Sequence, residues 1–196
     1  MFSSEHVVQR LIFSLFLNPC DYLVLTSNQG NQYVSSYSDT ASVLFVCLGN
    51  ICRSPSAHAV FRAKVKQHNL AVEVDSAGTA AYHVGAKPDQ RSQQAGEARG
   101  YDFKGLTARK VSELDFEQFD LILAMDKSNY SDLMNRCPEQ YQHKVKLMMD
   151  FAQHHLDQDE VPDPYYGGAA GFEYVLDLIE DASEGIIMNI QKEKVN

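Results

Sequence analysis

Residues 43–55 read V-L-F-V-C-L-G-N-I-C-R-S-P, and this stretch decides the fold of the chain. It opens with four consecutive apolar residues, a pattern typical of a strand buried on both faces of a sheet. A short loop from Cys47 to Ser54 follows. Ser54 and Pro55 then predict a helix, with serine as its N-cap and proline at its first position. The N–H groups of the loop and the positive end of this helix point at one place, which favours an anion there.

Two side chains in this stretch would turn an anion site into a reaction centre. Cys47 stands at the carboxyl end of the strand, where a helix N-terminus and a guanidinium both stabilise a thiolate nucleophile. Arg53 completes a C-x5-R frame, and its planar fork can hold two phosphate oxygens at once. We expect Ser54 to donate a hydrogen bond to the sulfur. Gly49 permits a positive φ, and Asn50 has a side chain able to pin the loop.

The C-x5-R spacing alone is a weak signal, since a lone cysteine is more often a small buried hydrophobic residue. The full string V-C-L-G-N-I-C-R-S-P after an apolar strand is much more specific, and it resembles the active-site signature of the low-molecular-weight protein tyrosine phosphatases. The resemblance runs from about Ser42 to the C-terminus. It implies hydrolysis of phosphotyrosine and small aryl phosphates through a phosphocysteine intermediate, without a metal or a cofactor. The residues expected to bind phosphate are Leu48, Gly49, Asn50, Ile51, Cys52 and Ser54.

The rest of the chain alternates between strand and helix patterns. Further strands are predicted at residues 71–75, 119–124 and 144–148. Helices are predicted at residues 55–70, 90–99, 127–135 and 171–190, with a helical turn at 112–116 and Asp126 as a cap. This order predicts one α/β domain of three layers, with a four-stranded parallel sheet and helices on both faces. The phosphate-binding loop then lies between the first strand and the first helix, where such sheets bind ligands.

A second loop is predicted to supply a proton. Thiolate attack on a phosphate ester expels an alkoxide or phenoxide, which needs an acid above the anion site. Asp163 in the string V-P-D-P-Y-Y-G is the candidate, because prolines on both sides stiffen the loop and the string resembles the family's general-acid loop. By the same resemblance, Tyr82, Tyr165 and Tyr166 line the substrate cleft. Two aromatic walls would admit a flat phosphoaryl group and exclude phosphoserine.

Other candidate residues have simpler interpretations. Cys52 is either a packing residue or a redox partner that traps oxidised Cys47 as a disulfide. His58 is expected to be a surface or packing residue. His154 and His155 lie on a polar stretch that is predicted to be helical, where adjacent side chains point in different directions, and they indicate a solvated face more than a metal site.

The composition of the chain narrows the possible binding partners and the cellular compartment. The chain has 196 residues and a formal net charge of -9, and an acidic domain is a poor nucleic-acid binder. Its four cysteines do not make a disulfide framework and suit a reducing, cytoplasmic compartment. No apolar run is long enough to span a membrane. We therefore expect phosphotyrosine-containing proteins as substrates, no nucleic acid or membrane partner, and a monomer or weak homodimer.

Residues 1–40 are expected to be a non-catalytic extension, and residues 41–196 the phosphatase domain. A signal peptide is conceivable at 11–17, but Arg10 is the only basic residue before it and no A-x-A-like cleavage site follows.

Three alternatives stay open at this point. Thioredoxin-coupled arsenate reductases share the loop but need a cysteine after the third strand, where this chain reads A-M-D-K-S-N. Phosphoarginine phosphatases carry threonine at the position of Ile51. The third alternative is a non-catalytic module that only captures phosphopeptides, against which the joint presence of Cys47, Arg53 and Asp163 argues.

Overall fold

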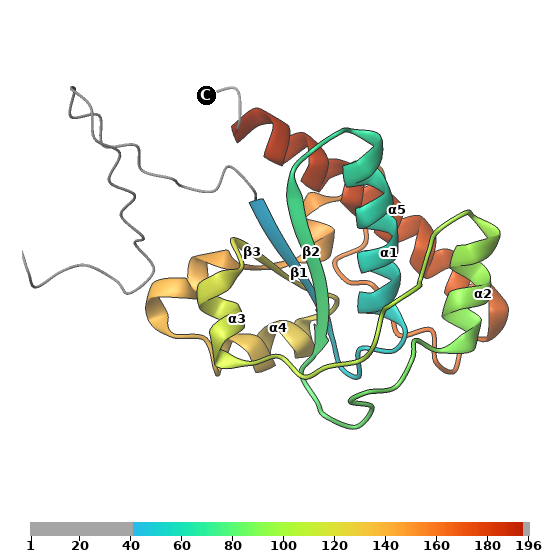
Figure 1. The fold of residues 1–196 in the computed structure, drawn as a ribbon, viewed down its shortest axis with the longest axis horizontal. Coiled ribbons are helices and arrows are strands. Elements are labelled where there is room, and N and C mark those ends of the chain that lie inside the picture. The colour runs from blue at the N-terminus through green and yellow to red at the C-terminus, as the bar shows by residue number, and fades with distance from the viewer. Residues whose placement is uncertain (1–40, 194–196) are drawn as a thin grey trace, which may run out of the picture. The chain divides into compact units, whose positions relative to one another are not determined.

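Four parallel strands form a central sheet in this computed structural model, which describes residues 41–193 (Figure 1). The strands are β1 (Ala41–Cys47), β2 (Val72–Gly78), β3 (Leu121–Ala124) and β4 (Val145–Leu147). Their order across the sheet is β2-β1-β3-β4. Because β2 and β3 lie on opposite sides of β1, the chain changes direction across the sheet at the end of β1, which is where open α/β sheets bind ligands. The predicted parallel sheet is confirmed.

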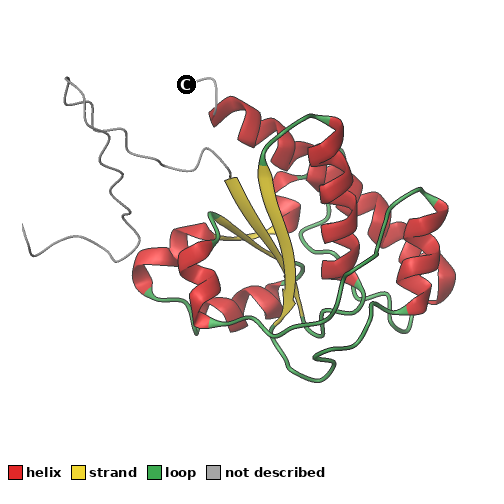
Figure 2. Ribbon diagram, viewed as in Figure 1, coloured by secondary structure: helices red, strands yellow, loops and turns green. Residues whose placement is uncertain are grey.

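The helices cover both faces of this sheet (Figure 2). Alternate side chains of β1 point to opposite faces, so Phe45 packs in one cluster with α1 (Arg53–Gln67) and α5 (Gly168–Glu193). Val46 packs in the other cluster, where Phe116 of α3 (Glu113–Gln118) and Leu133 of α4 (Lys127–Met134) close the second face. The remaining helices are α2 (Gln90–Ala98) and two 3-10 helices, η1 (Glu139–Lys144) and η2 (Met148–Phe151). The predicted three layers are therefore present.

Two predicted boundaries next to the loop were wrong. We predicted Ser54 as the N-cap, but α1 begins at Arg53 with Cys52 as its N-cap. Ser54 is fully buried and its hydroxyl contacts Cys47 and Asn50, so it does not cap the helix. Pro55 is still tolerated, because no N–H of the first turn has an intrahelical partner.

Strand β2 also runs to Gly78, beyond the predicted end at residue 75, because its last residues pair with β1 up to Cys47. Gly78 is needed at this place: a Cβ there would lie 2.7 Å from the Leu48 carbonyl oxygen. The close approach of strand and loop therefore depends on a residue without a side chain.

The predicted extension at residues 1–40 lies outside the described residues. Within residues 41–193, no helix is both long enough and apolar enough to cross a membrane.

Candidate active site

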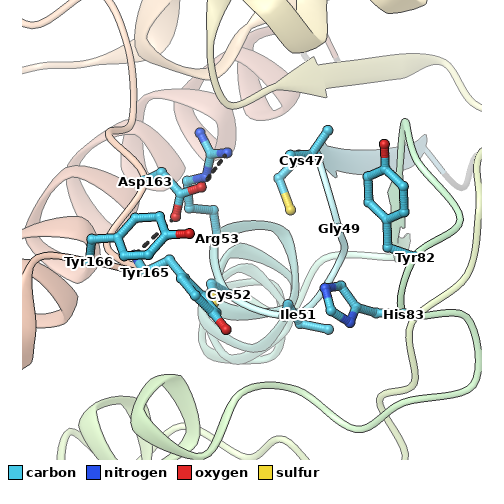
Figure 3. Close-up of a pocket in the computed structure, with 11 residues that line it drawn as sticks. Cys47, Gly49, Ile51, Cys52, Arg53, Tyr82, His83, Asp163, Tyr165 and Tyr166 are labelled. Atoms are coloured by element: carbon cyan, nitrogen blue, oxygen red, sulfur yellow. Dashed lines mark hydrogen bonds and ion pairs between the residues drawn. The ribbon is translucent and has the colours of Figure 1, made fainter.

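A cavity of about 310 Å³ opens at the carboxyl end of β1 (Figure 3). It contains all three predicted catalytic residues and all three predicted cleft tyrosines. Asn50 and Ser54 lie buried beneath it. The lining residues are Cys47, Leu48, Gly49, Ile51, Cys52, Arg53, Tyr82, His83, Asp163, Tyr165 and Tyr166. Residues more than a hundred positions apart are thus brought to one place by the order of the strands.

The floor of the cavity is the phosphate loop, by which we mean residues 47–54. The Cys47 sulfur lies 3.1 Å from the Ser54 hydroxyl oxygen, and the Asn50 N–H donates to it at 3.3 Å. The sulfur therefore has polar neighbours on the floor of the cavity, one of them a backbone donor. Cys47 is only 3% exposed, so a substrate must enter the cavity to reach it.

Asn50 holds the shape of this loop. Its φ is 55°, a left-handed conformation that few residues other than glycine adopt. Its side-chain nitrogen donates to the hydroxyls of Ser54 at 2.9 Å and Ser76 at 3.0 Å. Its side-chain oxygen accepts the Arg109 N–H at 2.9 Å. Every polar atom of the buried amide side chain therefore has a partner, and the predicted pinning role agrees with this geometry.

The positive φ that we predicted for Gly49 belongs to Asn50 instead, so that prediction was wrong. A larger residue at position 49 is disfavoured for a different reason. A Cβ at this position would lie 3.0 Å from the imidazole ring of His83, which also lines the cavity. His83 is a residue that sequence reasoning missed.

Arg53 is 4% exposed and is oriented by two further segments. Its Nη1 donates to the Asp126 carboxylate and, at 3.1 Å, to the Val161 carbonyl oxygen. Its Nη2 lies 3.6 Å from the Asp163 carboxylate. Burial alone would lower the pKa of Arg53, but the facing Cys47 and the bonded Asp126 outweigh it, and the pKa is raised. The guanidinium is therefore a permanent charge beside the sulfur.

Asp126 has two roles, of which the sequence indicated one. Its Oδ1 accepts the Asn129 N–H at 2.7 Å, which confirms the predicted cap of α4. Its Oδ2 accepts from Arg53, and this contact was missed. The available signal was position: Asp126 follows β3, the neighbour of β1, so its carboxylate lies at the same edge of the sheet as the phosphate loop.

One wall of the cavity is the acid loop, by which we mean residues 161–167. The Asp163 carboxylate accepts the Tyr165 N–H at 3.0 Å and points toward Arg53 (Figure 3). Tyr165 and Tyr166 pack edge to face, with ring centroids 5.0 Å apart. Tyr166 is 94% exposed and Tyr82 is 79% exposed, so both rings stand at the mouth of the cavity.

The second cysteine of the phosphate loop is chemically different from the first. Burial is the main cause that raises the pKa of Cys52 to about 12, and nearby acidic groups add to it. The Cys52 thiol is therefore protonated at neutral pH. Cys47, Cys52 and Cys137 are the free cysteines in the described part of the chain.

His154 and His155 bind a carboxylate of the described domain through their backbone N–H groups. Residues 153–155 are not helical, which corrects our expectation. Their N–H groups donate to the Asp181 carboxylate, and His155 Nδ1 lies 3.1 Å from it. No group of three or more potential ligands that could hold a metal occurs between residues 41 and 193. His58 is buried in α1, in agreement with the packing interpretation.

Comparison with known proteins gives one answer across the domain. Residues 42–196 match the family model described as low molecular weight phosphotyrosine protein phosphatase. A low molecular weight protein-tyrosine-phosphatase of Bacillus subtilis is 42% identical over 155 residues, covering 78% of this chain and 97% of that protein. The human low molecular weight phosphotyrosine protein phosphatase is 43% identical, covering 69% of this chain and 87% of that one. A protein tyrosine phosphatase crystal structure from Entamoeba histolytica superposes with a TM-score of 0.76 at 47% identity, covering 79% and 99% of the two chains.

Proposed function

The chain belongs to the low-molecular-weight phosphotyrosine protein phosphatases, and from this premise we propose how its residues divide the reaction. It is a cysteine-dependent protein-tyrosine phosphatase. The observation that carries our assignment is the Cys47 sulfur, which accepts the Asn50 N–H and lies 3.1 Å from the Ser54 hydroxyl on the floor of a cavity that Arg53 and Asp163 also line.

In the first step, the Cys47 thiolate attacks the phosphorus of the substrate. Loop N–H groups and the Arg53 fork bind the non-bridging oxygens, where negative charge must be stabilised as the bond to the leaving oxygen breaks. Asp163 gives its proton to the departing phenolate oxygen. The products of this step are a phosphocysteine and a free tyrosine side chain.

In the second step, Asp163 is a carboxylate and takes a proton from the water that attacks the phosphocysteine. The sulfur leaves as a thiolate, and the Ser54 hydroxyl, 3.1 Å away, stabilises it as the bond breaks. Inorganic phosphate is released, and Asp163 is protonated again. Every proton in this cycle is handled by a residue that lines the cavity.

The mouth of the cavity supports phosphotyrosine-containing proteins as substrates. Tyr82 and Tyr166 expose apolar rings on either side of a deep anion site, and a phenyl ring is long enough to pass between them. A phosphoserine side chain is too short to bring its phosphorus to a nucleophile that is 3% exposed.

The alternative chemistries fit the site less well. Arsenate reduction by a cysteine relay needs a further thiol in the segment directly after β3, where this chain has no cysteine. Cys137 is buried against the opposite face of the sheet, in the cluster with Leu44 and Leu133. Ile51 lines the cavity with an apolar side chain where phosphoarginine phosphatases carry a hydroxyl group.

We further propose that Cys52 protects the nucleophile under oxidation. A peroxide would convert the Cys47 thiolate to a sulfenic acid, and the Cys52 thiol would then displace water to give a disulfide. Because the pKa of Cys52 is raised to about 12, this step should be slow at neutral pH and faster in alkali. Free cysteines also support a cytoplasmic enzyme.

The assignment of the nucleophile is tested by Cys47→Ser, with Cys137→Ser as the matched buried-cysteine control. The serine variant should lose turnover of p-nitrophenyl phosphate by more than about 10⁴-fold yet still bind vanadate, because the loop N–H groups and Arg53 remain. The control should turn over normally. Residual turnover of the Cys47 variant within tenfold of wild type would exclude the covalent mechanism.

A further inference from the structure

Arg91, which lies outside the cavity, links the acid loop to a residue that is bonded to the phosphate loop. Arg91 lies in the first turn of α2, and its guanidinium has partners along both edges and over its plane. Its Nε and Nη2 donate to the two carboxylate oxygens of Asp89 at 3.0 and 2.9 Å. Its Nη1 donates to the Tyr165 carbonyl oxygen at 2.9 Å. Its Cζ lies 5.0 Å from the ring centroid of Tyr165 and 4.7 Å from that of Phe172, within cation–π range.

The Asp89 side of this arrangement is fixed to the phosphate loop. The Asp89 N–H donates to the Ile51 carbonyl oxygen at 2.7 Å. Its carboxylate also accepts the backbone N–H of Arg91 and so caps α2. The pKa of Asp89 is lowered, first by the side-chain hydrogen bonds from Arg91. Asp89 is therefore a carboxylate in a fixed position relative to the phosphate loop.

The Tyr165 side is part of the acid loop. The carbonyl group of Tyr165 accepts from Arg91, and the N–H of the same residue donates to the Asp163 carboxylate. The backbone of Tyr165 is thus bonded both to Arg91 and to Asp163. Displacing Tyr165 would move the donor that orients the acid.

A partly exposed arginine–carboxylate pair usually contributes little to stability, and the Arg91 side chain is 43% exposed. Its geometry nevertheless uses features that only arginine has: a two-point fork to Asp89, a third donor to a backbone carbonyl, and a flat face near two rings. The chain offers a comparison in the C-cap residue of the same helix. Arg99, at the other end of α2, pairs with Glu173, Asp177 and Glu180 of α5.

We propose that Arg91 is a positioning residue that sets the acid loop against the phosphate loop, so that Asp163 meets the leaving oxygen of the substrate. This inference rests on the proposed role of Asp163 as the general acid. Arg91 acts through Tyr165 and touches no substrate atom. Its loss should therefore impair proton delivery and leave the anion site intact.

The test compares Arg91→Met and Arg91→Lys with Arg99→Met. Each variant is assayed with a phosphotyrosine peptide, whose leaving group needs a proton, and with p-nitrophenyl phosphate, whose leaving group needs little help. Both Arg91 variants should lose about tenfold in kcat/KM, which reports departure of the leaving group, for the peptide and less than about threefold for the aryl phosphate, as expected for a misplaced acid. Their inhibition constants for vanadate should stay within about twofold of wild type, because the loop is unchanged. Arg99→Met should lower Tm and leave the ratio of the two rates unchanged.

The double variant Arg91→Met with Asp163→Asn separates this inference from the proposed function. If Arg91 acts through the acid, its loss should not change the rate ratio further once the acid is absent. A ratio altered by Asp163→Asn alone, but not by Arg91→Met, would overturn the inference and leave the role of Asp163 standing. A further tenfold change in the double variant would also overturn it. A ratio unaffected by Asp163→Asn would refute the assignment of the acid itself.

Discussion

The phosphate loop and the acid loop face each other across one cavity, but they are held in different ways. In the phosphate loop, Asn50 bonds to Ser54 within the loop and to Ser76 on the adjacent strand, and the nucleophile is 3% exposed. In the acid loop, the Asp163 side chain is 51% exposed, and the segment is held by arginines from elsewhere in the chain. The residues expected to bind the anion therefore lie in one short segment, whereas the position of the acid depends on contacts between distant segments.

The largest effect that would break this comparison is expected at Asp163. Asp163→Asn should slow a phosphotyrosine peptide by roughly 10²–10³-fold, because a phenolate with a pKa near 10 needs the proton. Hydrolysis of p-nitrophenyl phosphate should slow far less. The contrast is measured as kcat/KM for the two substrates, because kcat/KM reports formation of the phosphocysteine and not its hydrolysis, in which Asp163 also acts.

The neighbouring acids Asp159 and Glu160 serve as controls for this prediction. Both make contacts with Lys127 outside the cavity, so their Ala variants should leave the contrast unchanged. Equal slowing of both substrates by Asp163→Asn would instead mean that Asp163 only shapes the loop.

The second-largest effect is expected from Arg53→Lys, which tests the phosphate loop. Lysine keeps the charge but loses the two-point fork, so we expect a loss of at least ~2 kcal/mol in transition-state stabilisation, or about 30-fold in kcat/KM. Both substrates should be affected alike, because both depend on the anion site. A lysine variant with near-normal kcat/KM would show that charge alone is sufficient.

The next prediction concerns the free energy of unfolding and the buried residue His58 of α1. Burial is the main cause that lowers the pKa of His58 to about 4; Asp75 opposes this shift, while Arg62 and Arg109 add to it. In the unfolded chain, His58 is protonated below its ordinary pKa of 6.5. In the folded chain, it stays neutral until the pH falls to about 4. Stability should therefore fall as the pH drops through this window.

Urea unfolding at pH 8 and pH 5 tests this prediction against His58→Gln. Wild type should lose about 2 kcal/mol more than the variant between the two pH values. Identical losses would mean that His58 is solvated in the folded protein.

The smallest effect is expected from removal of residues 1–40. A chain that starts at Ala41 retains both loops and every strand between them. Its kcat/KM should equal that of the full chain within about twofold, and its Tm should shift by no more than a few degrees. Lower activity on the peptide alone would show that the comparison of two loops omits a third contributor.

The sequence was sufficient for the phosphate loop because its working parts are contiguous. The apolar strand, Cys47 and Arg53 lie within eleven positions of one another, and the alternating pattern that follows predicts the sheet. The missed contacts join distant positions: Arg53 to Asp126, Asn50 to Arg109, and Arg91 to the Tyr165 carbonyl, at separations of 73, 59 and 74 residues. No periodicity relates such positions.

The boundary errors have a local physical cause. Ser54 is a good N-cap residue by propensity, yet a buried sulfur and a buried amide compete for its hydroxyl. Gly49 is the more permissive residue, yet it is Asn50 that takes the positive φ, because its side-chain amide gains three hydrogen bonds there. In both cases the function of the loop overrode the intrinsic preference of the residue.

The donors that Asn50 holds in place have a consequence for the folding equilibrium. The folded phosphate loop lines the cavity, whereas an unfolded chain offers no such arrangement. Free phosphate therefore binds only the folded enzyme, and by mass action a concentration 100 times its dissociation constant stabilises the fold by about 2.7 kcal/mol. The reaction product thus occupies the site against the next substrate and, in the same act, protects the enzyme from unfolding.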